Sequence, residues 1–510
     1  MMKIIPFLVF FCSLSSVRGQ NTAVPDTVEY ARARAYANDF AEADRLLSLY
    51  TLTHNDINAY RLHAQVLYWM KAYSRAEAVY ETALATYPDV PVVKLDYGRM
   101  LFELGRMKRA EDLLNDYLPH DPRHAETHML LTYVDLWQGN SQAARNRIAQ
   151  LRLWYPDNKD IETLAGTVYA QTGTTFRAGC SYRADDQPLR KVSYTLEAGR
   201  ADTWWFSPVV RFRMDNFTVS TTTYTTQWLQ AGNTVTLGRM GLTVQGSAGL
   251  FTARYPGKKN GTGAGDQAVS ELTGSLQVTQ KLTPSLFLEL GGDRQPYQYT
   301  IASIQTPLLP YVAQASLRLN KADAWLGKAG YEVQQFRRTG RVTTAYGWLL
   351  APLLTTKRVD LKAGYAITYT DADRSTFVPA LSLNSILTNY RPDTPIRGVY
   401  DPYFSPANQL VNALLASARL RVVKGVELSA KANAGIWASA GNAYLYLDNG
   451  PGNTVVLNRD FGTMRYHPVV LEGDLRVTCS RHISLQASYT YSSLFFYKSH
   501  QASVDLKYHW

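Results

Sequence analysis

From residue 174 onward the chain alternates apolar and polar side chains with a period of two. The clearest run is the C-terminus, where Ala502, Val504, Leu506, Tyr508 and Trp510 alternate with Gln501, Ser503, Asp505, Lys507 and His509. Segments 358–369, 426–434 and 483–491 repeat the pattern. Successive side chains of a strand point to opposite faces, so each segment predicts a strand with one apolar and one polar face.

A soluble β-sandwich would alternate in the same way, so other features must separate it from a membrane barrel. Many of the alternating runs exceed ten residues, and Tyr and Trp gather at their ends. The chain stops on Trp510, at the close of an alternating strand, which resembles the C-terminal recognition signal of bacterial outer-membrane proteins. These features favour an antiparallel transmembrane β-barrel.

Connections between the alternating runs are by turns short and long. Short turns are expected near 201–203, 240–241, 282–284, 321–322, 355–356, 424–425 and 481. Longer loops are expected near 185–190, 216–224, 255–267, 296–309, 338–340, 372–407, 439–466 and 497–500. This alternation is typical of a barrel with short periplasmic turns and long extracellular loops. It predicts about 16 strands and room for an aqueous channel. Because this number is even, the start of the first strand and the end of the last strand should both face the periplasm.

The preceding segment has a different period, of 34 residues. Ala64, Ala76, Ala83 and Pro88 recur as Gly98, Ala110, Tyr117 and Pro122, and again as Thr132, Ala144, Leu151 and Pro156. Small residues suit the points where two helices of a hairpin cross closely, and proline closes the second helix. Residues 26–172 therefore resemble the tetratricopeptide repeat (TPR) family. The resemblance implies a helical solenoid whose usual function is docking of protein partners, although a rigid spacer is an alternative.

The first residues resemble a secretory signal peptide. A short basic start is followed by the apolar run Ile4 to Leu14, and Val17 and Gly19 provide small residues for cleavage after Gly19. The domain prediction is therefore a signal peptide at 1–19, a periplasmic TPR domain at 20–173 and an outer-membrane β-barrel at 174–510. The fold class is α + β multidomain, an all-α solenoid followed by a barrel of about 16 strands.

Charge separates the two domains. The full chain of 510 residues has a formal net charge of +11. Residues 174–510 hold 35 Lys and Arg against 22 Asp and Glu, a net charge of +13, whereas residues 20–173 have a net charge of −4. The expected registers turn these bases toward the barrel interior: Arg318, Arg358, Lys362, Arg419, Arg421, Lys431, Arg476 and Lys507. A basic water-filled passage would attract polyanions. Alternatively, paired charges brace the barrel wall.

Signals for catalysis are poor. The glycine-rich stretch 257–265 lacks the Gly-Lys-Ser/Thr ending of a phosphate-binding loop, and His124 is not followed directly by the Glu that a zinc-protease helix needs. Chain composition, with 46% apolar and 19% charged residues, excludes a disordered chain. No apolar stretch is long enough for a helical membrane protein. We therefore expect no enzyme, cofactor, metal or nucleic-acid partner. The sequence does not decide whether Cys180 and Cys479 bond to each other.

A TPR array followed by a barrel of about 16 strands resembles the exopolysaccharide export porins, such as those of cellulose and poly-N-acetylglucosamine secretion. The segment from Tyr400 to Pro406, YDPYFSP, is similar to a Tyr-Phe-Ser/Asn-Pro stretch in those barrels. The resemblance implies a conduit without catalytic residues and a TPR array that docks periplasmic proteins. Aromatic rings stack on sugars, so Tyr400, Tyr403, Phe404 and an inward-facing Trp437 are candidate contacts for a polysaccharide.

Two other functions fit the same architecture. Some TPR-barrel proteins help lipoproteins reach the cell surface, and the short array here suits that resemblance. A third interpretation is a scaffold, in which the barrel only anchors a partner-binding TPR groove. The exported cargo, neutral or anionic, is left open by the sequence.

Overall fold

The computed structural model describes residues 26–186, 189–201, 203–220, 222–255, 267–321, 324–337, 340–379, 381–389, 396, 398–480, 482–494 and 497–510. The predicted signal peptide and the glycine-rich stretch 257–265 lie outside these residues. The chain divides into two compact units, one up to Pro122 and one from Arg123 onward. None of the helices that the structure describes is both long and apolar enough to cross a membrane.

Paired helices fill the N-terminal region. Their bounds are α1 (Thr27–Tyr36), α2 (Phe40–Thr53), α3 (Ile57–Trp69), α4 (Tyr73–Thr86), α5 (Pro91–Glu103), α6 (Met107–Tyr117), α7 (Ala125–Trp137), α8 (Ser141–Trp154) and α9 (Lys159–Thr172). Helices α1 to α6 belong to the first unit, and α7 to α9 belong to the second unit together with the strands. The helical TPR fold predicted from the 34-residue period is confirmed.

The small residues of the repeat occupy the predicted crossing points. The side chains of Ala64, Ala76, Ala83, Ala110 and Ala144 are fully buried. Gly98 is packed so closely that a β-carbon added to it would lie 3.0 Å from the side chain of Leu114. The repeat prolines Pro88, Pro122 and Pro156 lie in the loops after α4, α6 and α8. Larger residues at the crossings would force the paired helices apart.

Tight turns within the helix pairs need a left-handed backbone. Gly105, between α5 and α6, has a φ of 74°, and Gly139, between α7 and α8, has a φ of 78°. Glycine has no β-carbon, so it adopts this conformation without steric cost. The sequence places both glycines 34 residues apart, and this spacing reproduces the same hairpin geometry in successive repeats.

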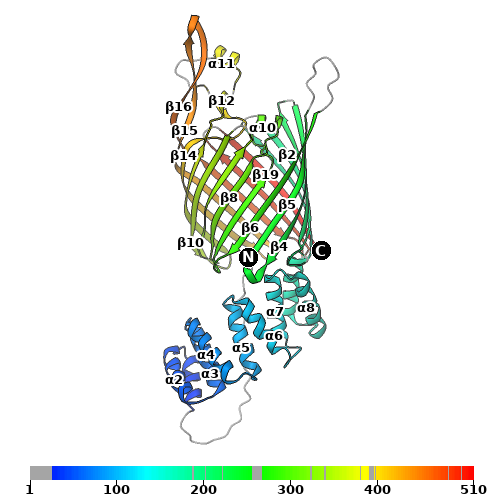
Figure 1. The fold of residues 1–510 in the computed structure, drawn as a ribbon, viewed down its shortest axis with the longest axis vertical. Coiled ribbons are helices and arrows are strands. Elements are labelled where there is room, and N and C mark those ends of the chain that lie inside the picture. The colour runs from blue at the N-terminus through cyan, green and yellow to red at the C-terminus, as the bar shows by residue number, and fades with distance from the viewer. Residues whose placement is uncertain are drawn as a thin grey trace. The chain divides into compact units, whose positions relative to one another are not determined.

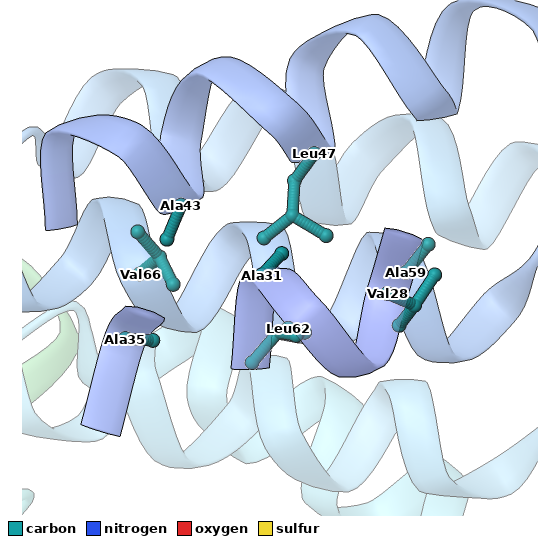
Figure 2. Close-up of a cluster of buried hydrophobic side chains, with 8 residues drawn as sticks. All are labelled: Val28, Ala31, Ala35, Ala43, Leu47, Ala59, Leu62 and Val66. Carbon is teal, nitrogen blue, oxygen red and sulfur yellow. The ribbon is translucent and has the colours of Figure 1, made fainter. Parts of the chain in front are cut away.

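Each helix pair buries a mainly aliphatic core. Figure 2 shows one such cluster, in which α1, α2 and α3 contribute Val28, Ala31, Ala35, Ala43, Leu47, Ala59, Leu62 and Val66. A polar group lies beside this cluster, where His63 of α3 bonds to Asp44 of α2 at 2.9 Å and Asp44 also pairs with Arg75 of α4 at 3.0 Å. The group ties three successive helices together.

The second unit contains a closed antiparallel barrel of 16 strands (Figure 1). Its strands are β1 (Thr174–Asp185), β2 (Leu189–Arg200), β3 (Pro208–Val219), β4 (Thr222–Leu237), β5 (Leu242–Tyr255), β6 (Gln267–Lys281), β7 (Leu286–Arg294), β8 (Tyr311–Asn320), β9 (Leu326–Phe336), β10 (Gly340–Thr355), β11 (Val359–Ala372), β14 (Ala407–Val423), β15 (Val426–Gly450), β16 (Thr454–Tyr466), β17 (Val469–Thr478), β18 (Ile483–Ser493) and β19 (Lys498–His509). Strands β16 and β17 pair with successive parts of β15 and fill one place in the wall. Pairing of β1 with β19 closes the cylinder.

The two ends of the barrel differ in the connections that they carry. One end carries the turns after β2, β4, β6, β8, β10, β14 and β17, together with Thr174 and Trp510; we call it the short-turn end. The other, the long-loop end, carries the loops 295–310 and 373–406. These loops hold two short helices, α10 (Ile301–Gln305) and α11 (Leu383–Asn389), and a small sheet of β12 (Phe377–Pro379) with β13 (Gly398–Tyr400). The predicted alternation holds only in part: residues 201–207 separate β2 from β3 at the short-turn end, whereas at the long-loop end β1 ends at Asp185 and β2 already begins at Leu189.

Two loop predictions were wrong. No long loop occupies 216–224, because β3 continues to Val219 and β4 begins at Thr222. Segment 439–466 is mainly a hairpin, since β15 runs to Gly450 and β16 returns from Thr454. In Figure 1 this hairpin, in orange, extends beyond the barrel wall. Both strand pairs continue past the point where simple alternation fades, because backbone pairing does not require an apolar face.

Candidate functional site

The strand register assigns each side chain to one of two faces of the wall. One row pairs Leu196, Phe212, Leu229, Leu250 and Leu272 directly across β2 to β6. These side chains are open, with 46% of Leu196, 53% of Leu229 and 73% of Leu272 exposed. This apolar face is the outer surface of the cylinder.

The neighbouring row is polar and belongs to the interior. It pairs Lys507, Arg177, Glu197, Arg211 and Gln230 across five strands. Adjacent positions carry ion pairs, with Arg177 to Asp505 at 3.0 Å, and an Arg211 to Glu197 contact between neighbouring strands. The interior is therefore a lining of hydrogen-bonding and charged groups.

All eight basic candidates lie on this polar face or at its edge by register. Five of them lie close to an acid: Arg318 pairs with Glu289, Lys362 with Asp360, Lys431 with Glu472 at 2.9 Å, and Arg419 and Arg421 approach Glu427 at 3.7 and 3.9 Å. Lys328 also pairs with Glu289, at 3.0 Å. Most of the interior charge is thus arranged in pairs, as the alternative of a braced wall expects.

The other three candidates are placed differently. Arg358 precedes β11, Arg476 lies near the end of β17, and Lys507 lies near the end of β19, all toward the short-turn end. Among the described residues, no ion pair to an acid joins any of the three. Arg476 contacts the amide oxygen of Gln486 at 3.5 Å.

A hollow of about 600 Å³ opens at the short-turn end beside β14, β15 and β17. Its lining residues are Arg358, Arg421, Val422, Val423, Lys424, Gly425, Val426, Glu427, Arg476 and Thr478. We call it the basic hollow, because four of these residues are basic and one is acidic.

The two long loops fold into the opposite end of the barrel. Ile304, in the loop after β7, packs against Leu189 and Phe217, whose register positions face the interior on β2 and β3. In the same loop, Gln298 donates a hydrogen bond to Thr226 on β4 at 3.0 Å. This loop therefore crosses the interior to reach strands well away from its own origin.

Hydrogen bonds lock this loop to the loop after β11. The Thr300 hydroxyl donates to the carbonyl of Pro402 at 2.8 Å, and the amide of Phe404 donates to the Tyr297 hydroxyl at 3.2 Å. The Tyr403 ring stacks on Phe336, with ring centroids 3.7 Å apart and planes at 7°. The two loops form one occluding layer, which we call the loop layer.

The structure corrects two of the aromatic candidates for sugar contact, Tyr400 and Tyr403, whereas Phe404 is half-buried and stays a candidate. The side chain of Tyr403 is fully buried and that of Tyr400 is 2% exposed, against Phe377 and Phe404. Their rings hold the loop layer together and offer no free face to a sugar. Neighbouring anchors such as Tyr297 and Phe336 were missed, because no local pattern in the sequence shows which loop packs on which strand.

Trp437 was predicted to face inward and faces outward instead. A β-bulge between β14 and β15 pairs Ala413 with Gly435 but Asn412 with Trp437. Asn412 shares its face with Ile367, which is 45% exposed on the outer surface. One extra residue in a strand exchanges its two faces from that point on, so simple alternation fails beyond Gly435.

The last helix pair contacts the short-turn end. Arg145 of α8 donates hydrogen bonds to the carbonyls of Thr172 at 2.7 Å and Ala201 at 3.2 Å. The amino group of Lys281, at the end of β6, lies 5.4 Å from the ring centre of Trp137. A β-carbon on Gly139 would lie 2.9 Å from Thr236 of β4. Helices α7 to α9 therefore pack on the barrel rim through specific contacts.

In the first unit, polar contacts link the first helices of successive repeats. Arg61 of α3 pairs with Asp96 of α5 at 2.6 Å, and the Tyr68 hydroxyl donates to Glu103. In the second unit, His124 and His128 lie four residues apart, but they have other contacts, since His124 caps α7 and His128 is buried beside Arg147. No group of three or more His, Cys, Asp or Glu residues placed to hold a metal occurs in the described residues. Cys180 and Cys479 are both free.

Comparisons with known proteins match the two parts separately. A family model described as tetratricopeptide repeat matches residues 70–132. No curated protein is significantly similar to the chain. A solved structure titled "Bacterial polysaccharide outer membrane secretin" is 10% identical, with a TM-score of 0.44, over 66% of this chain and 99% of its own. The TPR protein YrrB, described with an unusual peptide-binding site, is 19% identical, with a TM-score of 0.26, over 28% of this chain and 75% of its own.

The chain therefore combines a TPR region with a closed antiparallel barrel of 16 strands.

Proposed function

We propose that this protein is an outer-membrane conduit through which an exopolysaccharide leaves the cell. The observation that carries the proposal is a closed cylinder with an apolar outer face and a polar interior, preceded by helical repeats. Ten residues at about 3.3 Å each, tilted by about 40°, span about 25 Å, the height of the apolar band of such barrels. Sixteen strands give an interior wide enough for an aqueous channel.

The short-turn end faces the periplasm in this proposal. Both chain ends of the barrel lie there, with the amide of Trp510 bonded to the carbonyl of Thr174 at 2.8 Å. Helices α7 to α9 pack on this rim, so the repeats continue into the periplasm. In this proposal the TPR region docks periplasmic protein partners, while the barrel lies in the lipid bilayer.

A gene deletion tests the cargo. Cells that lack the protein should lose surface polysaccharide, measured by glycan staining of intact cells and by sugar analysis of the culture medium. Re-expression of the full chain should restore both. The amounts of surface-exposed lipoproteins, measured by protease shaving, should stay unchanged.

Opposite results identify the other functions. Loss of surface lipoproteins with normal polysaccharide would overturn the proposal in favour of lipoprotein delivery. Normal levels of both, with mislocalised periplasmic proteins, would favour a barrel-anchored scaffold.

A further inference from the structure

The basic hollow differs from the rest of the interior in its charge balance. Elsewhere in the wall, several basic side chains have a close acidic partner, as Lys431 has in Glu472 at 2.9 Å and Lys328 has in Glu289 at 3.0 Å. The hollow is lined by four bases, Arg358, Arg421, Lys424 and Arg476, and among its lining residues Glu427 is the acid. Because the bases outnumber the acid four to one, bracing of the wall by charge pairs accounts for only part of this cluster.

Glu427 stands between cations that do not bond to it closely. By register it lies directly opposite Arg421 on one neighbouring strand and Arg476 on the other. Its carboxylate is 3.9 Å from Arg421, beyond hydrogen-bond distance. Arg421 instead donates to the carbonyl of Lys357 at 2.9 Å, and its backbone amide bonds to Arg358 at 2.8 Å. The guanidinium groups thus keep donors free for another acceptor.

The cluster is open to water and to a ligand. The side chain of Arg421 is 37% exposed and that of Glu427 is 33% exposed, and Arg358, Lys424 and Arg476 are exposed residues. A volume of about 600 Å³ lies within the range of small-ligand sites. Arginine presents paired N–H donors that match the two oxygens of a carboxylate.

We propose that the basic hollow binds the acidic groups of an anionic polysaccharide as this polymer enters the barrel. The proposal rests on the proposed export function and specifies its cargo as a carboxylated sugar polymer. Binding at the short-turn end raises the local concentration of the polymer at the entrance, because clustered cations attract polyanions. Beyond this point several interior bases, such as Lys431 and Lys328, are paired with acids, so the polymer is held less tightly as it advances.

Binding of a defined probe tests the site in the full-length protein. The protein is placed in lipid nanodiscs of phosphatidylcholine, and fluorescently labelled oligogalacturonate is titrated at about 50 mM salt. Wild-type protein should bind it, and should not bind a neutral cello-oligosaccharide of equal length. Binding should weaken strongly at high salt, because exposed charges are screened.

Substitutions that remove a positive or a negative charge locate the binding site. Arg358→Gln, Arg421→Gln and Arg476→Gln should each weaken binding by about tenfold, the size expected for loss of one charge-assisted hydrogen bond. Glu427→Gln should strengthen binding, because it removes the negative charge among the cations. Lys321→Gln changes the net charge equally at another short turn and should leave affinity unchanged. The heat-dependent gel shift of folded barrels checks that each variant is folded.

Several results would overturn the inference. Equal affinity in wild type and the three arginine variants would place the probe elsewhere, and an unchanged or weaker affinity of Glu427→Gln would contradict the charge argument. Loss of probe binding when phosphatidylglycerol replaces part of the nanodisc lipid would make the hollow a lipid headgroup site instead. If the probe fails to bind although gene deletion removes surface polysaccharide, export stands and the anionic cargo is rejected.

Discussion

Replacement of Tyr403 by Ala should open the long-loop end of the barrel. The ring of Tyr403 is fully buried and stacks on Phe336 at 3.7 Å, and it anchors the loop layer to β9. Truncation of a buried aromatic side chain costs about 3–5 kcal/mol, of which stacking contributes about 0.5–1.5 kcal/mol. Even the lower value, about 3 kcal/mol, would raise the population of displaced loops roughly 150-fold.

Single-channel recording in planar bilayers measures this effect on the purified full chain. Wild-type protein should show a low open probability, and Tyr403→Ala should show frequent large openings. In cells, the same variant should admit large hydrophilic antibiotics such as vancomycin. Tyr403→Phe keeps the ring and should stay closed. Tyr444→Ala, at a tyrosine that is 42% exposed on the β15–β16 hairpin, should behave as wild type. If Tyr403→Ala conducts no more than wild type, the loop layer does not control passage.

Two further predictions follow from the other parts of the chain. In a Cys180→Ala variant, Cys479 in the turn after β17 should react with a large maleimide only after the outer membrane is permeabilised. Labelling of Cys479 in intact cells would show that the short-turn end faces the cell exterior. Asn449→Cys, on the long-loop side, is the positive control for labelling in intact cells. Burial lowers the pKa of His63, although the adjacent Asp44 opposes this, so the folded state favours the neutral imidazole. In the unfolded chain His63 gains a proton near pH 6.5, which stabilises the unfolded state below that pH. Hydrogen-exchange protection of α2 to α4 should therefore be full above pH 6.5 and decline below it. Protection that does not depend on pH, after correction for intrinsic exchange rates, would refute the assignment.

Much of the fold could be predicted, because each part has a strong periodic signal. The 34-residue spacing of Ala76, Ala110 and Ala144 specifies three equivalent helix crossings, all of them fully buried. The alternation of apolar and polar side chains specifies strand faces without knowledge of their neighbours. For this reason the interior positions of Arg318 and Lys431 agree with the register that the structure shows.

What periodicity could not provide is the path of the loops and the exceptions to the period. Trp437 was misplaced by a bulge of one residue, which leaves no mark in composition. Tyr400 and Tyr403 were predicted to contact a polysaccharide, but they are buried against Phe377 and Phe336, which lie far from them in the loop or on another strand. Likewise, the sequence shows how many bases face the interior but not that acids neutralise most of them, because partners across strands depend on the register.

The seam between β1 and β19 has a consequence for assembly. It pairs Thr175 with His509 from the two ends of the barrel segment, whereas the other neighbouring strands of the wall lie close together along the chain, with β16 between β15 and β17. Hairpins can therefore zip up one after another, but the cylinder seals only when the final strand meets the first. Until then the nascent sheet has two unpaired edge strands, whose free backbone N–H and C=O groups can pair wrongly with another chain. Such remote contacts also form slowly. Both edge strands, β1 and β19, therefore need protection from other chains between synthesis and closure of the barrel.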